Sequence, residues 1–213
     1  MNLVIAASLW TLFALFSLRA RSRGKNTFQW ATLLLAVSMT LNVDSIYTSF
    51  DALMPIGNLG NLLANGTMIT GLFLVLRAIR EGTRSTDKRG QSQWDMWALI
   101  ATLVIIVSSF TLLDAPQTST TFMLDFGDQL ATAIYSSAQF IFIGSVLIFT
   151  GAVLAKSAPY LRSGRYRVGM RILVIGCFIG VALSVSVLTM NVLHLAGELA
   201  LMRTIGSVHD VLR

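Results

Sequence analysis

The segment Ile172–Leu195 reads ILVIGCFIGVALSVSVLTMNVLHL and contains no Asp, Glu, Lys or Arg. A helix that crosses a bilayer needs about 20 mostly apolar residues, because the hydrocarbon core is about 30 Å thick and a helix rises about 1.5 Å per residue. The segment is therefore long and apolar enough to span a membrane. Similar runs precede it, and together they predict six spans at Leu3–Leu18, Phe28–Ile46, Leu59–Ile79, Met96–Leu113, Leu130–Ala155 and Ile172–Leu195.

The composition of the whole chain agrees with a membrane-embedded helical fold. Of 213 residues, 54% are hydrophobic and 12% are charged, and the mean hydropathy is +0.71. Soluble domains carry about 25% charged residues. The apolar residues form continuous runs rather than strict alternation, which excludes a β-barrel. We predict an all-α, polytopic transmembrane helix bundle over residues 1–195. Residues 196–213 are predicted to form an amphipathic tail, or alternatively the start of a seventh span.

Lys and Arg gather in three stretches between the apolar runs, whereas residues 47–58 and 114–129 contain none. Short loops rich in Lys and Arg stay in the cytoplasm, so we expect a multi-pass protein of the cytoplasmic membrane with its N-terminus outside. The first run is followed rather than preceded by basic residues, which favours an anchor over a signal peptide. The cytoplasmic loops singled out by this argument contain Arg19, Arg21, Arg23, Arg84, Arg162, Arg165 and Arg167.

The same basic clusters indicate the partners of the chain. Basic residues next to membrane spans attract anionic lipid headgroups. Nucleic-acid binding is not expected, because the spans divide the basic residues among separate loops. A cytoplasmic partner protein is a further candidate for these loops.

The most suggestive polar feature is a series of asparagines at the start of the third run. Asn58, Asn61 and Asn65 recur at three- and four-residue spacing, which predicts that their amides share one helical face. Asparagine is costly in lipid, so this face should point into the bundle or a wet cavity. It can line a path for a polar solute, or its amides can join neighbouring helices. The candidate pathway residues are Asn58, Asn61, Asn65, Thr67, Ser108, Ser137 and Gln139.

The last run carries two further patterns. Gly176, Gly180 and Ser184 recur at four-residue spacing, which predicts close helix packing within the bundle or in a homo-oligomer. His194 and Glu198 stand one helical turn apart, as an interfacial pair or as two ligands of a metal. Because no third ligand can be assigned nearby, we predict no metal site and no cofactor.

The chain contains no motif of a known catalytic chemistry. It has no Gly-rich phosphate loop, no HExxH and no nucleophile elbow. No Asp, Glu, Lys, Arg or His falls securely near the middle of a predicted span, where proton relays place such residues. We therefore expect that the protein is not an enzyme.

The segment Pro55–Leu63, PIGNLGNLL, opens the third run after an N-out start and an Arg-rich first loop. In these features the chain resembles a family of actinobacterial multi-helix integral membrane proteins, commonly labelled transporters or regulatory membrane proteins. The resemblance implies a seven-helix bundle with a further C-terminal region, whereas this sequence ends at Arg213. The layout is also similar to the seven-helix input modules of bacterial sensor kinases, which implies ligand detection and a cytoplasmic output.

These patterns lead to one main functional expectation and two alternatives. We expect a small-solute transporter, permease-like, whose substrate moves along the Asn58–Asn61–Asn65 face. The first alternative is a sensory or regulatory membrane module that acts through its basic cytoplasmic loops. The second is a structural membrane subunit that packs through the Gly176–Gly180 stripe.

Overall fold

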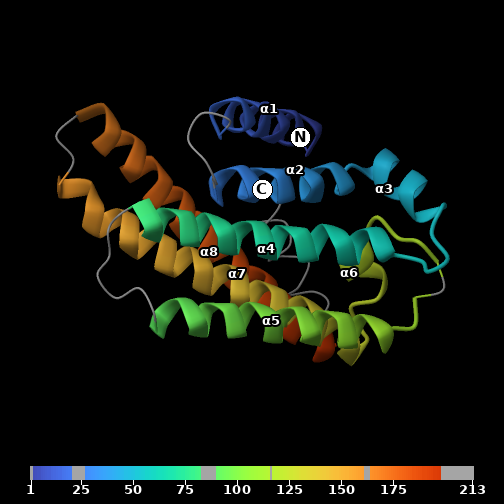
Figure 1. Ribbon diagram of the computed structural model, residues 1–213. Helices are drawn as coiled ribbons and strands as arrows, with labels where there is room; N and C mark the ends of the chain where they lie inside the picture. The colour runs from blue at the N-terminus through green and yellow to red at the C-terminus, as the bar shows by residue number, and fades with distance from the viewer. Residues whose placement is uncertain (1, 21–26, 83–89, 116, 161–163, 198–213) are drawn as a thin grey trace.

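The computed structural model describes residues 2–20, 27–82, 90–115, 117–160 and 164–197, and these residues form helices without any β-strand (Figure 1). The apolar runs of the sequence become helices, since a helix satisfies its own backbone hydrogen bonds. In chain order the elements are α1 (Asn2–Ala20), α2 (Thr27–Leu41), α3 (Asp44–Asp51), α4 (Leu59–Gly82), α5 (Gly90–Thr111), α6 (Phe122–Asp125), α7 (Leu130–Ser157), the 3₁₀ turn η1 (Ala158–Tyr160) and α8 (Gly164–Leu195).

Four of these helices are long and apolar enough to cross a membrane. They are α4, α5 over Gln93–Thr111, α7 and α8. Helices α2 and α3 would add a fifth span if they were one element, and α1 is apolar but shorter. The described residues thus confirm an all-helical chain whose apolar helices suit a membrane-embedded protein.

The residues of the predicted span Phe28–Ile46 do not form one continuous helix, because the chain bends by 84° between α2 and α3. The Asn42 side-chain amide donates to the Ser38 carbonyl (2.9 Å), and Val43 then adopts an extended conformation. Asn competes well for the backbone groups at a helix end. Asp44 follows in the first turn of α3, where a negative charge is favoured by the helix dipole. The apolar pattern alone could not reveal this break.

Several other helix boundaries differ from the predicted spans. Helix α8 begins at Gly164 rather than Ile172, and α5 begins at Gly90 rather than Met96. Neither polar stretch contains a residue that ends a helix, so each helix extends beyond the apolar residues of its predicted span. Arg165 and Arg167 are therefore helical residues and not loop residues. Arg19 also lies within a helix, α1, whereas Arg21, Arg23, Arg84 and Arg162 lie outside the described residues.

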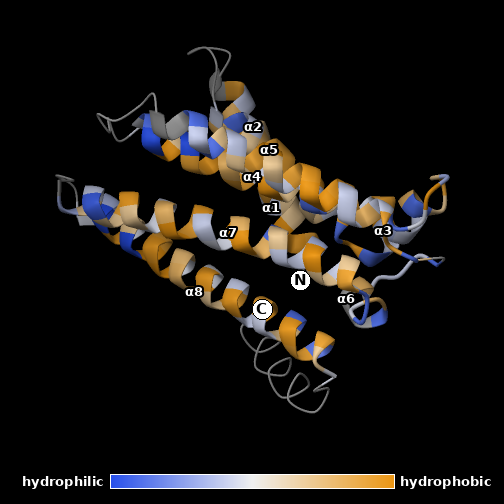
Figure 2. Cartoon of the chain, turned by 90° about the horizontal axis from the view of Figure 1, so that it is seen from below, coloured by the Kyte–Doolittle hydropathy of each residue, from blue (hydrophilic) through white to orange (hydrophobic). Residues whose placement is uncertain are grey.

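The helices pack as an open row. Helix α1 packs on α2, α2 on α4, α4 on α7 and α7 on α8, while α5 packs on both α4 and α7. Figure 2 shows α7 and α8 on one side of the molecule and α2, α4 and α5 on the other. The apolar core lies between α4, α5 and α7 and consists of Ile69, Phe73, Leu76, Leu99, Ile106, Phe122, Tyr135, Phe142, Ile143 and Val146.

Helix α1 lies antiparallel to α2 along its length. The Asn2 amide donates to the Asn42 carbonyl (2.9 Å) near one end, and Gln29 Nε2 donates to Ser17 Oγ (3.0 Å) near the other. Between them, Trp10 Nε1 donates to Thr40 Oγ1 (3.0 Å). This bond explains a tryptophan in the middle of an apolar run, away from the headgroup region where such rings usually lie.

The predicted small-residue stripe of α8 is only partly in contact with another helix. A Cβ added at Gly180 would lie 2.5 Å from Leu147 Cδ1, and Ser184 packs against Gly144 of α7. In the described part of the chain, a Cβ at Gly176 would meet nothing within 4 Å, so this glycine does not serve helix packing there. Cys177 packs instead, against Gly151. The homo-oligomer contact proposed for Gly176 stays a prediction.

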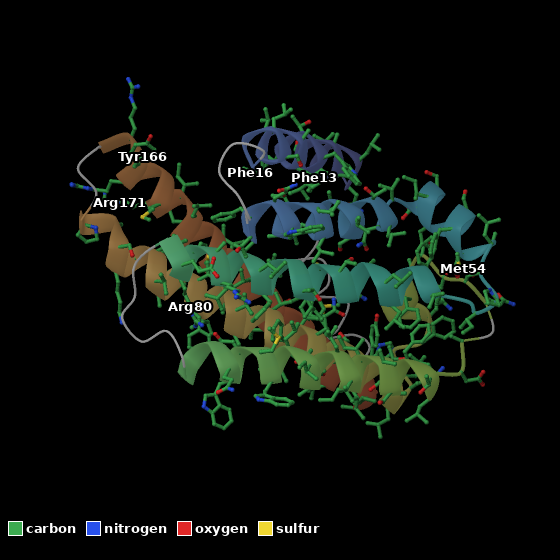
Figure 3. The ribbon with its side chains drawn as sticks, viewed as in Figure 1. Phe13, Phe16, Met54, Arg80, Tyr166 and Arg171 are labelled. Atoms are coloured by element: carbon green, nitrogen blue, oxygen red, sulfur yellow. The ribbon has the colours of Figure 1, made fainter. Side chains whose placement is uncertain are left out.

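Charged side chains collect at the two ends of the bundle. We call one end acidic, and its described residues include Asp44, Asp51, Asp114, Asp125 and Asp128 around α3, α6 and the start of α7. We call the other end basic, and it includes Arg77, Arg80, Lys156, Arg165, Arg167 and Arg171 together with Glu81 and Asp95. Figure 3 shows Arg80, Tyr166 and Arg171 toward the basic end and Met54 at the opposite end.

Candidate functional site: an amide-lined pocket

Asn58 does not lie on the helical face that the spacing predicted. It precedes α4 with φ of 62°, in the left-handed region that Asn tolerates better than most residues. Its side chain is buried, and Oδ1 accepts from the Tyr47 hydroxyl (2.8 Å) and the Ser119 amide (2.9 Å). Its Nδ2 donates to the Gln117 carbonyl (2.9 Å). Asn58 is thus a structural residue that joins α3, the start of α4 and the segment before α6.

The partner of this asparagine is the buried carboxylate of Asp51. Asp51 Oδ1 accepts from the Gly60 amide (3.0 Å), and Oδ2 accepts from the Thr118 hydroxyl (2.6 Å) and the Asn58 amide. These contacts place a negative charge at the N-terminus of α4, which the helix dipole favours. Burial, and then the nearby Asp51, raise the pKa of Tyr47, so its hydroxyl remains a neutral donor. We call Tyr47, Asp51, Asn58, Thr118 and Ser119 the acidic-end cap.

Asn61 and Asn65 do share one face of α4, and they meet α7. Asn65 Nδ2 donates to Asn61 Oδ1 (3.0 Å) and to the Tyr135 hydroxyl (2.8 Å). Gln139 Nε2 donates to Asn65 Oδ1 (2.9 Å), and the Tyr135 hydroxyl lies 3.4 Å from the Asn61 carbonyl. The interaction of Gln139 with the asparagine face agrees with the predicted grouping. We call Asn61, Asn65, Tyr135 and Gln139 the amide cluster.

A second polar contact joins α7 to α8 beside the amide cluster. Asn191 Nδ2 donates to Ser136 Oγ (3.0 Å) and to Ser137 Oγ (3.2 Å). Ser137 therefore acts by holding Asn191 in place. Sequence reasoning did not include Tyr135 and Asn191 among the site residues. The sequence did contain an indication of both residues. Tyr135 lies one helical turn from Gln139, and Asn191 is an amide residue within an apolar run.

The amide cluster, Ser136 and Asn191 line a pocket of about 600 Å³ between α1, α2 and α4 on one side and α7 and α8 on the other. The lining does not extend toward the basic end beyond Met39, Met68, Leu147 and Gly180, so the pocket occupies the half of the bundle toward the acidic end. Its polar lining residues are Asn2, Asn42, Asn61, Asn65, Tyr135, Ser136, Gln139, Ser184, Asn191 and His194.

Four of the seven predicted pathway residues do not line this pocket: Asn58 and Ser137, described above, and Thr67 and Ser108. The Thr67 hydroxyl donates to the carbonyls of Leu63 (2.7 Å) and Ala64 (3.0 Å) in its own helix. Ser108 is exposed on α5, and its carbonyl accepts from Thr111 (2.8 Å). Hydroxyls commonly bond to their own helix in this way. Neither side chain lines the pocket, so both are assigned to the helix surface.

His194 lies at the pocket, whereas Glu198, its predicted partner, lies outside the described residues. Within the described part of the chain, no group of three or more His, Cys, Asp or Glu side chains could hold a metal ion. The chemistry available at the pocket is hydrogen bonding by neutral amides and hydroxyls.

Toward the basic end, ionic contacts join the helices that form the pocket. Arg80 of α4 forms an ion pair with Asp95 of α5, and its guanidinium lies 5.7 Å from the Phe149 ring centroid of α7. Glu81 pairs with Arg77 (3.0 Å) and accepts from the Thr27 hydroxyl of α2 (3.1 Å). These contacts hold α2, α4, α5 and α7 together where the pocket has ended.

No protein-family model, no curated protein and no solved structure matches the chain. The function is therefore argued from the site itself.

Proposed function

We propose that the chain is a small-solute carrier of the cytoplasmic membrane, with six spans, that binds its substrate in the amide-lined pocket. The pocket carries this proposal, since it brings polar residues of three long apolar helices to one space. Polar side chains inside membrane helices are costly and usually serve a substrate or a structural bond. Here the acidic-end cap has the structural bonds, and the amide cluster faces a cavity of about 600 Å³.

The orientation is proposed to place the N-terminus and the acidic end outside. Each described long helix runs between the two ends, and the hydrogen bonds of α1 along α2 support its role as a first span. The loops at the acidic end, 47–58 and 114–129, contain no Lys or Arg. External loops of membrane proteins are poor in these residues. The pocket would then open toward the outer side.

A carrier is favoured over a continuous channel. A channel needs a polar path from one side to the other. The lining of this pocket ends near the middle of the bundle, and Arg80 packs over Phe149 farther toward the basic end. A pocket confined to one half of the bundle is consistent with one state of a carrier that alternates its access.

The test is solute flux through proteoliposomes that contain the purified chain. The probes are radiolabelled glycerol, xylitol and glucose. Asn65→Leu should slow the flux of a transported probe by about tenfold or more, as expected from the loss of about 1.4 kcal/mol of binding. The matched controls are Thr67→Val and Ser108→Ala, which remove polar groups outside the pocket. Equal flux in wild type and a correctly inserted Asn65→Leu protein would contradict the proposal.

One observation favours a sensory or regulatory function as the second candidate. Helix α8 carries pocket residues Asn191 and His194 near one end and exposed Arg165 and Arg167 at the other. A ligand that moves α8 could therefore alter a basic surface that meets a cytoplasmic partner or anionic lipid headgroups. Changing Arg162, Arg165 and Arg167 to Gln should then abolish partner recruitment while solute binding is unchanged.

A further inference from the structure

The pocket wall contains no Asp, Glu, Lys or Arg among the described residues. Tyr135 and His194 are its only ionisable side chains within that part of the chain. An ion taken out of water without an opposite charge loses much hydration free energy. The wall therefore favours an uncharged ligand over a carboxylate or an ammonium ion.

The polar part of the wall has hydrogen-bonding capacity that the described protein groups do not use. Nδ2 of Asn61, Oε1 of Gln139 and Oδ1 of Asn191 have no hydrogen-bond partner among the described residues. Together they offer amide donors and two carbonyl acceptors. A carboxamide or a pair of hydroxyls, which both donate and accept, would complement this set.

The rest of the wall is mostly apolar. Met39 of α2 and Met68 of α4 lie on one side, and Leu183, Val187 and Met190 of α8 lie on the other. Methionine side chains adapt to apolar molecules of different shapes. An apolar chain of several carbons would bury surface here that a small polar solute would leave empty.

Among the described residues, the two sides of the pocket do not form a closed ring. Helix α8 packs chiefly on α7 (Figure 2). It does not pack extensively on α1 or α2, which form the other side of the pocket. If the long helices cross a bilayer, the space between these sides faces lipid. A molecule dissolved in the outer leaflet can then reach the amide cluster from the side.

We infer that the ligand is an uncharged amphipathic molecule, with a carboxamide or hydroxyl end held by Asn61, Gln139 and Asn191 and an apolar chain against α8. The inference rests on the proposed solute binding at this pocket and specifies the class of molecule bound. A membrane lipid with a neutral headgroup and a free amphiphile share this chemistry.

The test measures binding to the full chain in lipid nanodiscs by the shift of its thermal unfolding midpoint. The four probes are octanamide, octanoate, octylammonium and acetamide, which vary the charge and the apolar chain separately. Octanamide should raise the midpoint, and octanoate and octylammonium should bind about tenfold or more weakly, because they are charged. Acetamide should bind about 100-fold or more weakly, because it lacks the chain.

Variants locate the binding within the pocket. Gln139→Leu removes the polar end of the site, and Val187→Trp fills its apolar part without changing the amide cluster. Both should lose the octanamide shift, measured against each variant's own midpoint, and Ser108→Ala should keep it. An excess of lipids with a glycerol headgroup should compete with octanamide if a membrane lipid is the natural source, and a lack of competition indicates a free amphiphile.

The results separate this inference from the proposed carrier function. Binding of octanoate or acetamide as tight as that of octanamide would overturn the inference, as would an octanamide shift that both pocket variants retain. The carrier proposal would still stand if Asn65→Leu abolished flux. Octanamide binding at the pocket without flux of glycerol, xylitol or glucose would support the inference and count against a carrier of small polar solutes.

Discussion

The acidic-end cap and the amide cluster are both built from polar side chains near the start of α4, yet they use them differently. In the cap, Asp51 accepts three hydrogen bonds and Asn58 forms three with its side chain, all within the protein. In the amide cluster, Asn61 and Gln139 each keep groups that no described residue uses. An asparagine in an apolar sequence is structural when other protein groups use all of its hydrogen-bonding atoms. It can contact a ligand when some of those atoms are left unused.

The largest expected effect comes from the cap. Asp51→Asn should lower the free energy of unfolding by about 3 kcal/mol, because hydrogen bonds to a buried charged group are among the strongest and their donors would lose a partner. The measurement is denaturant unfolding of the purified protein in detergent. Asp44→Asn is the control, because Asp44 is exposed on α3, and it should change stability by less than about 0.5 kcal/mol. Equal effects at both positions would refute the role given to Asp51.

The second effect separates the backbone of Asn58 from its side chain. Asn58→Ala should destabilise by about 2–3 kcal/mol, because it removes buried hydrogen bonds and forces alanine into the left-handed region. Asn58→Gly removes the same bonds but tolerates φ of 62°, so it should cost about 1 kcal/mol less. Unfolding midpoints of the two variants test this order, and a less stable glycine variant would contradict it.

The third prediction concerns the amide cluster, where function should suffer more than stability. The double variant Asn65→Leu/Gln139→Leu should unfold within about 1 kcal/mol of wild type. Apolar groups replace both partners of the Gln139–Asn65 hydrogen bond, and the two other partners of Asn65 line the pocket, where water can reach them. Flux or octanamide binding should nevertheless be lost. Stability and binding would be measured on the same preparation. A loss of stability as large as that of Asp51→Asn would show that the cluster is also structural.

The smallest effect belongs to the exposed side of α8. Gly176→Ala should leave stability unchanged or raise it by up to about 1 kcal/mol, since alanine favours helix and the new Cβ meets nothing within 4 Å. Gly151→Ala should cost about 1 kcal/mol, because its Cβ would lie 3.3 Å from Cys177 Cβ. Thermal unfolding of both variants distinguishes a packed glycine from an exposed one. A destabilised Gly176→Ala protein would indicate an unseen contact, such as a second copy of the chain.

The sequence was sufficient to predict the helical class, the apolar helices and the polar face of Asn61 and Asn65. Periodicity reports which residues share a helical face. Gln139 of another helix was expected to face the same interior only because it is polar within an apolar run, and its amide does contact Asn65. Periodicity could not separate Asn58 from the face of Asn61 and Asn65, since the spacing is the same whether or not the helix has begun. The break at Asn42–Val43 was missed because polar residues such as Asn42 and Asp44 also occur near the end of an unbroken span, and only the local hydrogen bonds of Asn42 show that the helix stops there.

Thr67 and Ser108 show the opposite limit. Their hydroxyls suited a polar pathway by composition, but the Thr67 hydroxyl donates to carbonyls of its own helix and Ser108 lies exposed on α5. Tyr135 and Asn191 depended on which faces of α4, α7 and α8 meet, and a single sequence contains no record of that packing. The sequence therefore predicted the kind of site, a polar face inside the bundle, but not all of the residues that form it.

The most direct measurement is the accessibility of the pocket from outside the cell. In a Cys177→Ala background, single cysteines replace Val187, which lines the pocket, and Val146, which is buried in the apolar core. A membrane-impermeant thiol reagent added to intact cells should modify the Val187→Cys protein and spare the Val146→Cys protein, and octanamide should slow the reaction. Labelling of Val187→Cys only in inverted vesicles, or no difference between the two positions, would contradict an outward-open amide pocket.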